Sequence, residues 1–298
     1  MAATTTAADK RAAFRAGLTS GRIQRFPGAF NPLVAKLIQE IGFEGVYVSG
    51  AVVSAELALP DIGLTTLTEV VERGRRIARV TDLPVLIDAD TGFGEPMNAA
   101  RTVTMLEDAG LAGCHIEDQV NPKRCGHLDG KAVVPVADMV RRLRAAVSAR
   151  RDPGFVVCAR TDARGAEGLD AAIDRAKAYA DAGADLIFTE ALADAGEFAK
   201  FRAAVDIPLL ANMTEFGKSE LLSATELESL GVNAVIYPVT TLRLAMFAVE
   251  SGLREIAATG TQSALVDRMQ HRARLYELLE YSRYNEFDSD IFNFTVSE

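Results

Sequence analysis

Eight short β-rich runs, separated by helix-forming stretches, are the feature that most constrains the fold of this chain. The runs are 25–30 (RFPGAF), 45–50 (GVYVSG), 84–90 (PVLIDAD), 113–118 (GCHIED), 155–161 (FVVCART), 186–191 (LIFTEA), 208–213 (PLLANM) and 234–239 (AVIYPV). Helical patterns between and after them cover 32–41, 67–80, 99–109, 136–149, 169–182 and 242–250. A strand followed by a helix, repeated in this way, predicts parallel βα units closed into a (βα)8 TIM barrel.

An open, doubly wound sheet is the main alternative to the barrel. It would need a glycine-rich phosphate loop after the first strand, and residues 28–32 (GAFNP) do not supply one. Apolar residues make up 49% of the chain and charged residues 24%, which is typical of a globular protein with a sizeable core. We therefore expect an N-terminal arm or helix over 1–24, the barrel over 25–258 and a helical extension over 259–298.

The C-terminal extension is not needed to close a barrel. Residues 263–284 have one long helical pattern, and its apolar side chains share a face: Leu265, Val266, Met269, Leu275, Tyr276 and Leu279. We expect a helix that covers the barrel or reaches into a neighbouring subunit, and we favour oligomerisation as the reason for its apolar face. Packing within the same chain is the alternative.

Charge and cysteine content disfavour several classes of protein. The net charge is −9, and no run of Lys or Arg marks a surface for nucleic acid or anionic lipid. Three cysteines in a long chain favour a reducing compartment over a disulfide framework. No apolar run approaches a membrane span, and the N-terminus lacks the apolar core of a secretory signal. We expect a cytoplasmic protein, with a transit peptide as the weaker alternative.

Polar residues stand where otherwise apolar strands end, which is the position of active sites in barrels of this kind. Carboxylates recur there, at Asp88, Asp90, Glu117, Asp118, Asp162 and Glu190. Converging carboxylates repel one another unless a cation intervenes, so we predict a hard divalent ion, Mg²⁺ or Mn²⁺. Alternation along the strand places Asp88 and Asp90 on the same side, where both can hold the ion or its waters. Helix capping or a loop hydrogen bond is the alternative for either residue.

Arg160 comes near the end of the strand predicted over 155–161. A guanidinium inside a barrel is costly without an anionic partner, because it loses its hydration. A substrate carboxylate is the partner we expect. A structural ion pair with Glu190 is the alternative.

A further reactive pattern is the polar segment 123–127 (KRCGH), directly after the fourth strand. Nearby positive charge lowers the pKa of a thiol, and Gly126 allows the backbone to approach a ligand closely. Cys125 is therefore a candidate for acid–base or nucleophilic work.

The remaining cysteines and histidines have simpler interpretations. Cys114 and Cys158 lie inside apolar strands and are expected to be core thiols. His115 and His271 are expected to be structural. No C-x-x-C or H-x-x-x-H spacing indicates a zinc site.

Seven segments together resemble the isocitrate lyase/phosphoenolpyruvate mutase superfamily, over a span from about residue 26 to residue 292. They are 47–50 (YVSG), 59–61 (LPD), 88–94 (DADTGFG), 115–119 (HIEDQ), 123–127 (KRCGH), 159–162 (ARTD) and 211–214 (ANMT). DADTGFG and the EDQ element resemble the superfamily as a whole, whereas KRCGH is similar to the loop of its carbon–carbon lyases and is absent from its mutases. Isocitrate lyases share the loop but are longer, so the compact chain most resembles the members that cleave 2-methylisocitrate.

The resemblance implies a Mg²⁺-dependent lyase that cleaves 2-methylisocitrate to pyruvate and succinate in the methylcitrate cycle of propionate breakdown. It also implies a homotetramer that exchanges its terminal helices. Metal binding falls to Asp88 and Asp90, and Cys125 would protonate the succinate carbanion. The other residues assigned to catalysis are Asp61, Glu117, Lys123, His127 and Arg160.

The resemblance also assigns the contacts with substrate. They are Ser49, Gly50 and Ala51 for a carboxylate, Cys125 and Gly126 for the succinate portion, and Arg160, Glu190, Asn212, Met213, Thr214, Arg243 and Arg272. Ala51 stands where some members of the superfamily carry glycine.

Other activities remain as alternatives. Oxaloacetate acetylhydrolase, 2,3-dimethylmalate lyase and isocitrate lyase activity are the rivals on the same scaffold. A catalytically silent protein that binds metabolites is the alternative from another class, and intact Cys125, Asp88 and Asp90 count against it. The expected ligand is a small tricarboxylate, with neither nucleic acid nor membrane as a partner.

Overall fold

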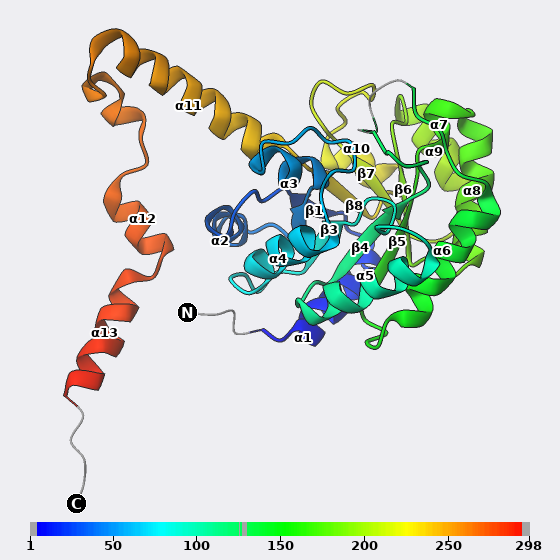
Figure 1. The fold of residues 1–298 in the computed structure, drawn as a ribbon, viewed down its shortest axis with the longest axis horizontal. Coiled ribbons are helices and arrows are strands. Elements are labelled where there is room, and N and C mark those ends of the chain that lie inside the picture. Colours follow the sequence, from blue (N-terminus) through cyan, green and yellow to red (C-terminus); the bar gives the residue numbers. More distant parts are fainter. Residues whose placement is uncertain (1–4, 125, 127–129, 294–298) are drawn as a thin grey trace, which may run out of the picture. The chain divides into compact units, whose positions relative to one another are not determined.

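The computed structural model describes residues 5–124, 126 and 130–293 and contains the predicted barrel (Figure 1). Its strands are β1 (Gln24–Pro27), β2 (Val46–Val48), β3 (Val85–Asp88), β4 (Gly113–Glu117), β5 (Val156–Thr161), β6 (Leu186–Thr189), β7 (Leu209–Asn212) and β8 (Ala234–Tyr237). All pairings are parallel, in the order β1-β8-β7-β6-β5-β4-β3-β2. One bridge, between Gly28 and Tyr47, joins β1 to β2. The eight strands therefore form a nearly closed barrel, which confirms the predicted TIM-barrel fold.

Helices precede, connect and follow the strands. They are α1 (Ala7–Leu18), α2 (Pro32–Ile41), α3 (Gly50–Glu56), α4 (Leu67–Ala78), α5 (Pro96–Asp108), α6 (Val136–Ala149), α7 (Ala163–Ala166), α8 (Leu169–Asp181), α9 (Ala195–Ala204), α10 (Ala224–Ser229) and α11 (Thr240–Thr259). Helix α1 precedes the first strand, α2 to α10 connect successive strands around the barrel, and α11 follows the last strand. Local sequence explains several of the helix starts. Thr66 with Glu69, and Ser223 with Glu226, form capping boxes before α4 and α10. Pro occupies the first position of α2 and α5, where its missing N–H costs nothing.

The core has two layers, as expected of a barrel with an outer ring of helices. One cluster contains the residues between the strands and the surrounding helices, for example Val103, Leu106 and Ile116. A second cluster fills the barrel interior, for example Phe26, Leu86, Val156, Leu186 and Leu210. Because the interior is packed, the chemistry is restricted to the rim where the strands end.

Helix α1 closes the other end of the barrel, where the strands begin. Its Phe14 and Leu18 belong to the interior cluster, and the Phe14 ring lies 5.0 Å from that of Phe26. Arg11 Nε donates to the Leu111 carbonyl ahead of β4, and Arg15 donates to the Phe155 carbonyl ahead of β5. The N-terminal segment is therefore part of the barrel and fixes the end opposite the candidate site.

The C-terminal prediction was wrong in one respect. The segment 263–284 is not one helix, because it contains the 3-10 turn η1 (Ser263–Arg268), α12 (Arg272–Leu278) and the start of α13 (Tyr281–Phe292). Extended backbone at His271 and a left-handed conformation at Glu280 separate the pieces. Neither Gly nor Pro marks these breaks, so helical periodicity alone could not locate them.

Contacts within the chain divide it into two units, one of residues 2–242 and another that contains residues 243–298. Large apolar side chains recur in the second unit, and its helices do not bury them among themselves: Phe247, Leu253, Val266, Phe287 and Ile291. Over the residues that the structure describes, no helix is both long and apolar enough to cross a bilayer.

Candidate active site

The C-terminal ends of the strands surround a small polar cavity. Its wall includes Tyr47, Ser49, Ala51, Asp61, Asp88, Lys123, Arg124, Gly126, Arg160, Phe188, Glu190, Asn212 and Thr214. Its volume is about 50 Å³, room for one or two water molecules.

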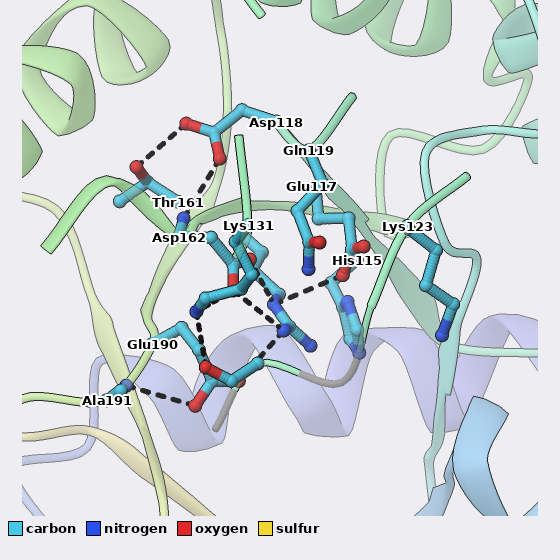
Figure 2. Close-up of polar contacts among 12 residues, drawn as sticks. His115, Glu117, Asp118, Gln119, Lys123, Lys131, Thr161, Asp162, Glu190 and Ala191 are labelled. Atoms are coloured by element: carbon cyan, nitrogen blue, oxygen red, sulfur yellow. Dashed lines mark hydrogen bonds and ion pairs between the residues drawn. The ribbon is translucent and has the colours of Figure 1, made fainter. Parts of the chain in front are cut away.

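Arg160 of β5 pairs with three carboxylates, Glu117, Asp162 and Glu190, which Figure 2 shows gathered in one cluster. Its Nε is 2.9 Å from Asp162 Oδ2 and 3.3 Å from Glu117 Oε2, and its Nη2 is 3.0 Å from Glu190 Oε2. The guanidinium also stacks over the Phe188 ring, 5.0 Å from its centroid. The ion pair with Glu190, predicted as the alternative partner, is therefore present. The hydrogen bonds and ion pairs described for Arg160 involve Nε and Nη2, so Nη1 is the nitrogen that we expect to receive a carboxylate.

Glu117 and Asp118 follow each other at the end of β4 but face different surroundings. Glu117 is buried beside Arg160, and burial raises its pKa well above the ordinary range, which favours the neutral acid. Asp118 accepts hydrogen bonds from Thr161 Oγ1 and Tyr179 Oη, both at 2.8 Å. Asp118 was expected among the converging carboxylates, and this expectation was wrong. Successive side chains of a strand point to opposite faces, so Asp118 turns outward and ties β4 to α8.

Asp88 and Asp90 lie together at the end of β3, and both are buried. Lys123 Nζ is 2.8 Å from Asp90 Oδ1 and also contacts Asp61, so this lysine joins two acidic residues of the rim. Burial, followed by the negative charge of Asp88, raises the pKa of Asp90 to about 6. Burial alone would lower the pKa of Lys123, but Asp90 and Asp88 outweigh it and raise that pKa.

The residues at Asp88 and Asp90 fit a divalent cation. Among the described residues no set of three His, Cys, Asp or Glu side chains forms a complete metal cage. Mg²⁺, however, commonly keeps several waters and takes one or two carboxylates from the protein. Two buried carboxylates lie together here, and the charge of Asp88 adds to burial in raising the pKa of Asp90, although Lys123 Nζ lies 2.8 Å from Asp90 Oδ1. A cation with bound waters would offset the remaining repulsion between the two carboxylates.

The segment 49–51 approaches Asp88 closely at the start of α3. The Gly50 backbone N–H donates to Asp88 Oδ2 at 3.2 Å. A Cβ at Gly50 would lie only 2.8 Å from the same oxygen, so the position requires glycine. Ser49 and Ala51 line the cavity beside it.

The predicted substrate contacts at the end of β7 lie on the opposite wall. Asn212 Nδ2 is 3.3 Å from Glu190 Oε1, and Thr214 lines the cavity. Met213 is buried beside them, and its sulfur accepts from the Leu222 N–H at 3.3 Å. Its side chain therefore belongs to the packing behind the wall.

The segment that follows β4 forms one side of the cavity. The Gln119 side chain holds its first part, because Nε2 donates to the Arg124 carbonyl at 2.8 Å and Oε1 accepts from the Arg124 N–H at 2.9 Å. Gly126 is buried near Arg160 and Glu190. Cys125 and His127, predicted to be catalytic, lie outside the described residues.

Two further predicted contacts, Arg243 and Arg272, belong to the second unit of the chain. Their assignment as substrate contacts therefore stays a prediction.

His115 and Tyr47 are close to the site although the sequence did not single them out for it. Tyr47 Oη and His115 Nε2 are 2.7 Å apart, and His115 Nδ1 faces Asp88 Oδ1 at 3.6 Å. Burial lowers the pKa of His115 to about 4, so its imidazole is neutral at pH 7. The pair lies directly behind Asp88 and can orient that carboxylate. Tyr47 and His115 occupy inward positions of β2 and β4, which is the only sequence signal for this role.

Comparison with known proteins places this geometry in a family. The phosphoenolpyruvate phosphomutase family matches residues 14–257. A Corynebacterium glutamicum protein described as "Probable 2-methylisocitrate lyase 2" is 71% identical, over 97% of this chain and 94% of that protein. An oxaloacetate acetylhydrolase solved with the inhibitor 3,3-difluorooxalacetate superposes with a TM-score of 0.90 at 32% identity, covering 98% of this chain and 99% of that one. A phosphonopyruvate hydrolase solved with oxalate and Mg²⁺ has a TM-score of 0.85 at 31% identity, covering 94% and 98%.

The family match spans most of the barrel, and the high identity extends over nearly the whole chain. With eight parallel strands and a carboxylate-rich rim in place, this chain belongs to the phosphoenolpyruvate mutase/isocitrate lyase superfamily, as a lyase.

Proposed function

We propose that this enzyme cleaves 2-methylisocitrate into pyruvate and succinate, a step of propionate breakdown. The observation that carries the proposal is the 71% identity to a protein of that name over 97% of the chain. The rim supports it, because carboxylates beside a buried arginine suit an anionic substrate and a divalent cation together.

The reaction breaks the bond between the carbon that bears the hydroxyl and its neighbour that bears a carboxylate. The hydroxyl loses its proton, its carbon becomes the carbonyl of pyruvate, and the electron pair of the broken bond passes to the carbon that becomes part of succinate. A divalent ion at Asp88 and Asp90 would lower the pKa of the substrate hydroxyl and neutralise charge on the pyruvate portion.

Arg160 is proposed to bind the carboxylate that takes up the electron pair. Its polar contacts described above use Nε and Nη2, so Nη1 is the proposed donor, and burial strengthens a charge-assisted hydrogen bond at this position. Cys125 is proposed as the acid that protonates the new carbanion, with Lys123 and His127 beside it in the sequence. Asp61 and Glu117 complete the proposed catalytic set, Asp61 through its contact with Lys123.

The substrate contacts are proposed as the sequence predicted them. Ser49 and Ala51 line the cavity on one side, and Glu190, Asn212 and Thr214 line it on the other, which supports their assignment. Gly50, Gly126, Met213, Arg243 and Arg272 complete the proposed set.

We extend the proposal to a cytoplasmic homotetramer in which the helices after residue 259 take part in subunit contacts. The apolar side chains that these helices leave uncovered among themselves support the assembly. Two buried free thiols, Cys114 and Cys158, support a reducing compartment.

The decisive experiment assays four acids side by side with saturating Mg²⁺: 2-methylisocitrate, isocitrate, 2,3-dimethylmalate and oxaloacetate. We expect 2-methylisocitrate to have the highest kcat/KM, exceeding isocitrate by about 10–200-fold, the range that one methyl group confers in a fitted pocket. Excess EDTA should abolish turnover, and Mg²⁺ or Mn²⁺ should restore it. If another of the four acids has the higher kcat/KM, that acid and not 2-methylisocitrate is the substrate. Binding of the acids without turnover of any of them would indicate a catalytically silent binding protein.

A further inference from the structure

Lys131 is a buried cation that none of the roles above includes. It follows the segment after β4, and its side chain is only 4% exposed. Its Nζ lies 2.7 Å from Asp162 Oδ1 and donates to the Gly126 carbonyl. Figure 2 shows it pointing into the same cluster as Asp162 and Glu190. Burying an ammonium group is costly unless it is well paired, so both contacts require an explanation.

Asp162 connects Lys131 to Arg160. The carboxylate of Asp162 is fully buried and accepts from Arg160 Nε at 2.9 Å and from Arg160 Nη2 at 3.2 Å. The second bond ends on Oδ1, the same oxygen that contacts Lys131. Two cations therefore share one carboxylate.

The charges in this cluster balance only when Lys131 is counted. Glu117, beside Arg160 Nε, counts as the neutral acid because burial raises its pKa. Arg160 and Lys131 are positive, whereas Asp162 and Glu190 are negative. Without Lys131, Arg160 alone would have to neutralise both carboxylates. It would then attract a substrate carboxylate less strongly, because more of its charge would already be compensated.

Gly126 receives the other contact of Lys131 and packs directly against Arg160 and Glu190. A Cβ at Gly126 would lie 2.4 Å from Arg160 Nη2 and 2.6 Å from Glu190 Cγ, so the backbone touches the ion pair itself. The donor on Lys131 thus fixes the carbonyl of a residue that forms part of the cavity wall.

Lys131 is not needed to hold the base of the segment. The Val120 N–H donates to the Ala132 carbonyl, and the Val134 N–H donates to the Asp118 carbonyl, both at 2.8 Å. These backbone hydrogen bonds join residues 118–120 to residues 132–134 without the side chain of Lys131. We therefore relate its contacts with Gly126 and Asp162 to the organisation of the site.

We propose that Lys131 is a positioning residue: it fixes Gly126 and Asp162 so that the guanidinium of Arg160 presents its Nη1 edge to the carboxylate of the succinate portion. The inference rests on the proposed function for the identity of that carboxylate. It predicts that Lys131 influences binding at the succinate end of the site and leaves the pyruvate end unaffected.

The test compares Lys131→Met, Lys131→Arg and the matched control Lys177→Met, which alters an exposed lysine of α8. We expect Lys131→Met to lower kcat/KM for 2-methylisocitrate about 10²-fold, the loss typical of a group displaced by about 1 Å. Product inhibition by succinate should weaken about tenfold, or roughly 1.4 kcal/mol, while inhibition by pyruvate stays within about twofold. Lys131→Arg should recover at least about tenfold of the lost kcat/KM, because it restores the charge. Lys177→Met should behave as the parent.

Asp162→Asn provides a second test through a double-mutant cycle. If Lys131 acts through Asp162, Lys131→Met should cost at least about fivefold less kcat/KM in the Asp162→Asn background than in the parent. In the double variant, Asp162→Asn also removes the negative charge that Lys131→Met leaves without its partner. The double variant can therefore still be compared with Asp162→Asn if Lys131→Met alone purifies poorly. Full additivity, equal weakening of succinate and pyruvate, or a kcat/KM for Lys131→Met within about threefold of the parent would overturn the proposal.

Failure of the proposed function is distinguishable from failure of this inference. If the parent enzyme does not cleave 2-methylisocitrate, the proposed function fails on that result alone. The crystal structures of the parent and of Lys131→Met then decide the positioning role, because a Gly126 carbonyl and an Arg160–Asp162 pair that stay in place without Lys131 would refute it.

Discussion

Arg160 is held by Asp162 on two of its nitrogens and by Glu190 on one, while Phe188 supports its flat face. A guanidinium fixed in this way loses little side-chain freedom when it binds a carboxylate, so more of the interaction energy remains for binding. The carboxylates therefore do more than neutralise the arginine: they determine which of its edges remains available.

The assignment of Cys125 as the proton donor can be tested by removing the thiol. We expect Cys125→Ala to lower kcat by about 10²–10⁴-fold, the usual contribution of acid–base catalysis. The thermal unfolding temperature and Mg²⁺ binding should be unchanged, because one residue of the polar sequence segment 123–127 is expected to contribute little to core packing. Cys125→Ser should also fail, since a hydroxyl is a much weaker acid than a thiol. Steady-state kinetics and calorimetry provide the measurements.

Alkylation serves as the control for this prediction. Iodoacetamide should inactivate the parent, with succinate protecting it. Cys114 and Cys158 should stay unlabelled in the folded protein, because both are fully buried and burial raises the pKa of each thiol. A Cys125→Ala variant with kcat within about threefold of the parent would transfer the role to Glu117 or His127.

The sequence predicted the rim residues that stand directly at strand ends, and for a physical reason. A charged group such as Asp88 or Arg160 at the end of an apolar strand is unusual enough to be noticed without a structure. Lys131 could not be found in this way. It lies well after the end of β4, whereas its partner Asp162 directly follows β5, so their contact depends on the path of the segment after β4. Asp118 was misassigned because strand alternation was not applied across β4.

At the level of elements, the βα units were predictable because short, β-rich apolar runs alternate with helical period-3.6 patterns along the barrel. Helices α2 and α6 coincide with the predicted ranges, whereas the observed strands are shorter than the predicted runs at one or both ends. α11 extends over Thr240–Thr259, well beyond the predicted 242–250, because the helix continues through Gly252. The breaks in 263–284 depend on backbone conformation at His271 and Glu280, which a pattern of apolar residues does not encode.

Helix α1 is predicted to contribute measurably to the stability of the barrel through Arg11. Its guanidinium donates to the Leu111 and Glu107 carbonyls and to Asp152 Oδ2, and it is almost fully buried. Arg11→Met should lower the free energy of unfolding by about 2–4 kcal/mol, because it leaves buried acceptors without a donor. Arg141→Met, which removes an exposed pair with Asp138, should change it by less than about 0.5 kcal/mol. Urea unfolding of the three proteins provides the comparison.

The same contact has a defined pH dependence. The hydrogen bond from Arg11 lowers the pKa of Asp152 in the folded protein. Its contribution is therefore fully present above the unfolded pKa of about 3.9 and is lost as the pH falls through the lower folded value. The difference in stability between the parent and Arg11→Met should be constant from pH 7 to about 5 and shrink below about pH 4. A constant difference down to pH 3 would show that Asp152 contributes nothing to it.

For the whole molecule, the proposed role of residues 243–298 is contact between subunits. Deleting 261–298 is expected to lower the number of subunits per particle. The deletion removes exposed apolar side chains, such as Phe287 and Ile291, that are proposed to lie in subunit contacts. It should also abolish activity, because Arg272 is lost with it. Light scattering and the pyruvate assay measure the two effects separately.

Arg272→Met in the full-length chain is the control that separates assembly from catalysis. This variant should keep the native mass of the parent and lose activity. An unchanged number of subunits after the deletion would contradict the proposed subunit contact. Full activity of Arg272→Met would remove that residue from the proposed site.

The pairing of β1 with β8 has a consequence for synthesis on the ribosome. Gln24 pairs with Ala234, and the Ile23 N–H donates to Glu228, so the first strand finds these partners only near the end of the barrel. Its neighbour along the chain, β2, offers only the single bridge from Tyr47 to Gly28. At about 5–20 residues per second, translation takes about 10–40 s to deliver the last strand after the first. Throughout that interval the edge of β1 that pairs with β8 is unpaired in the nascent chain. The barrel therefore closes in a late step that brings its first and last strands together.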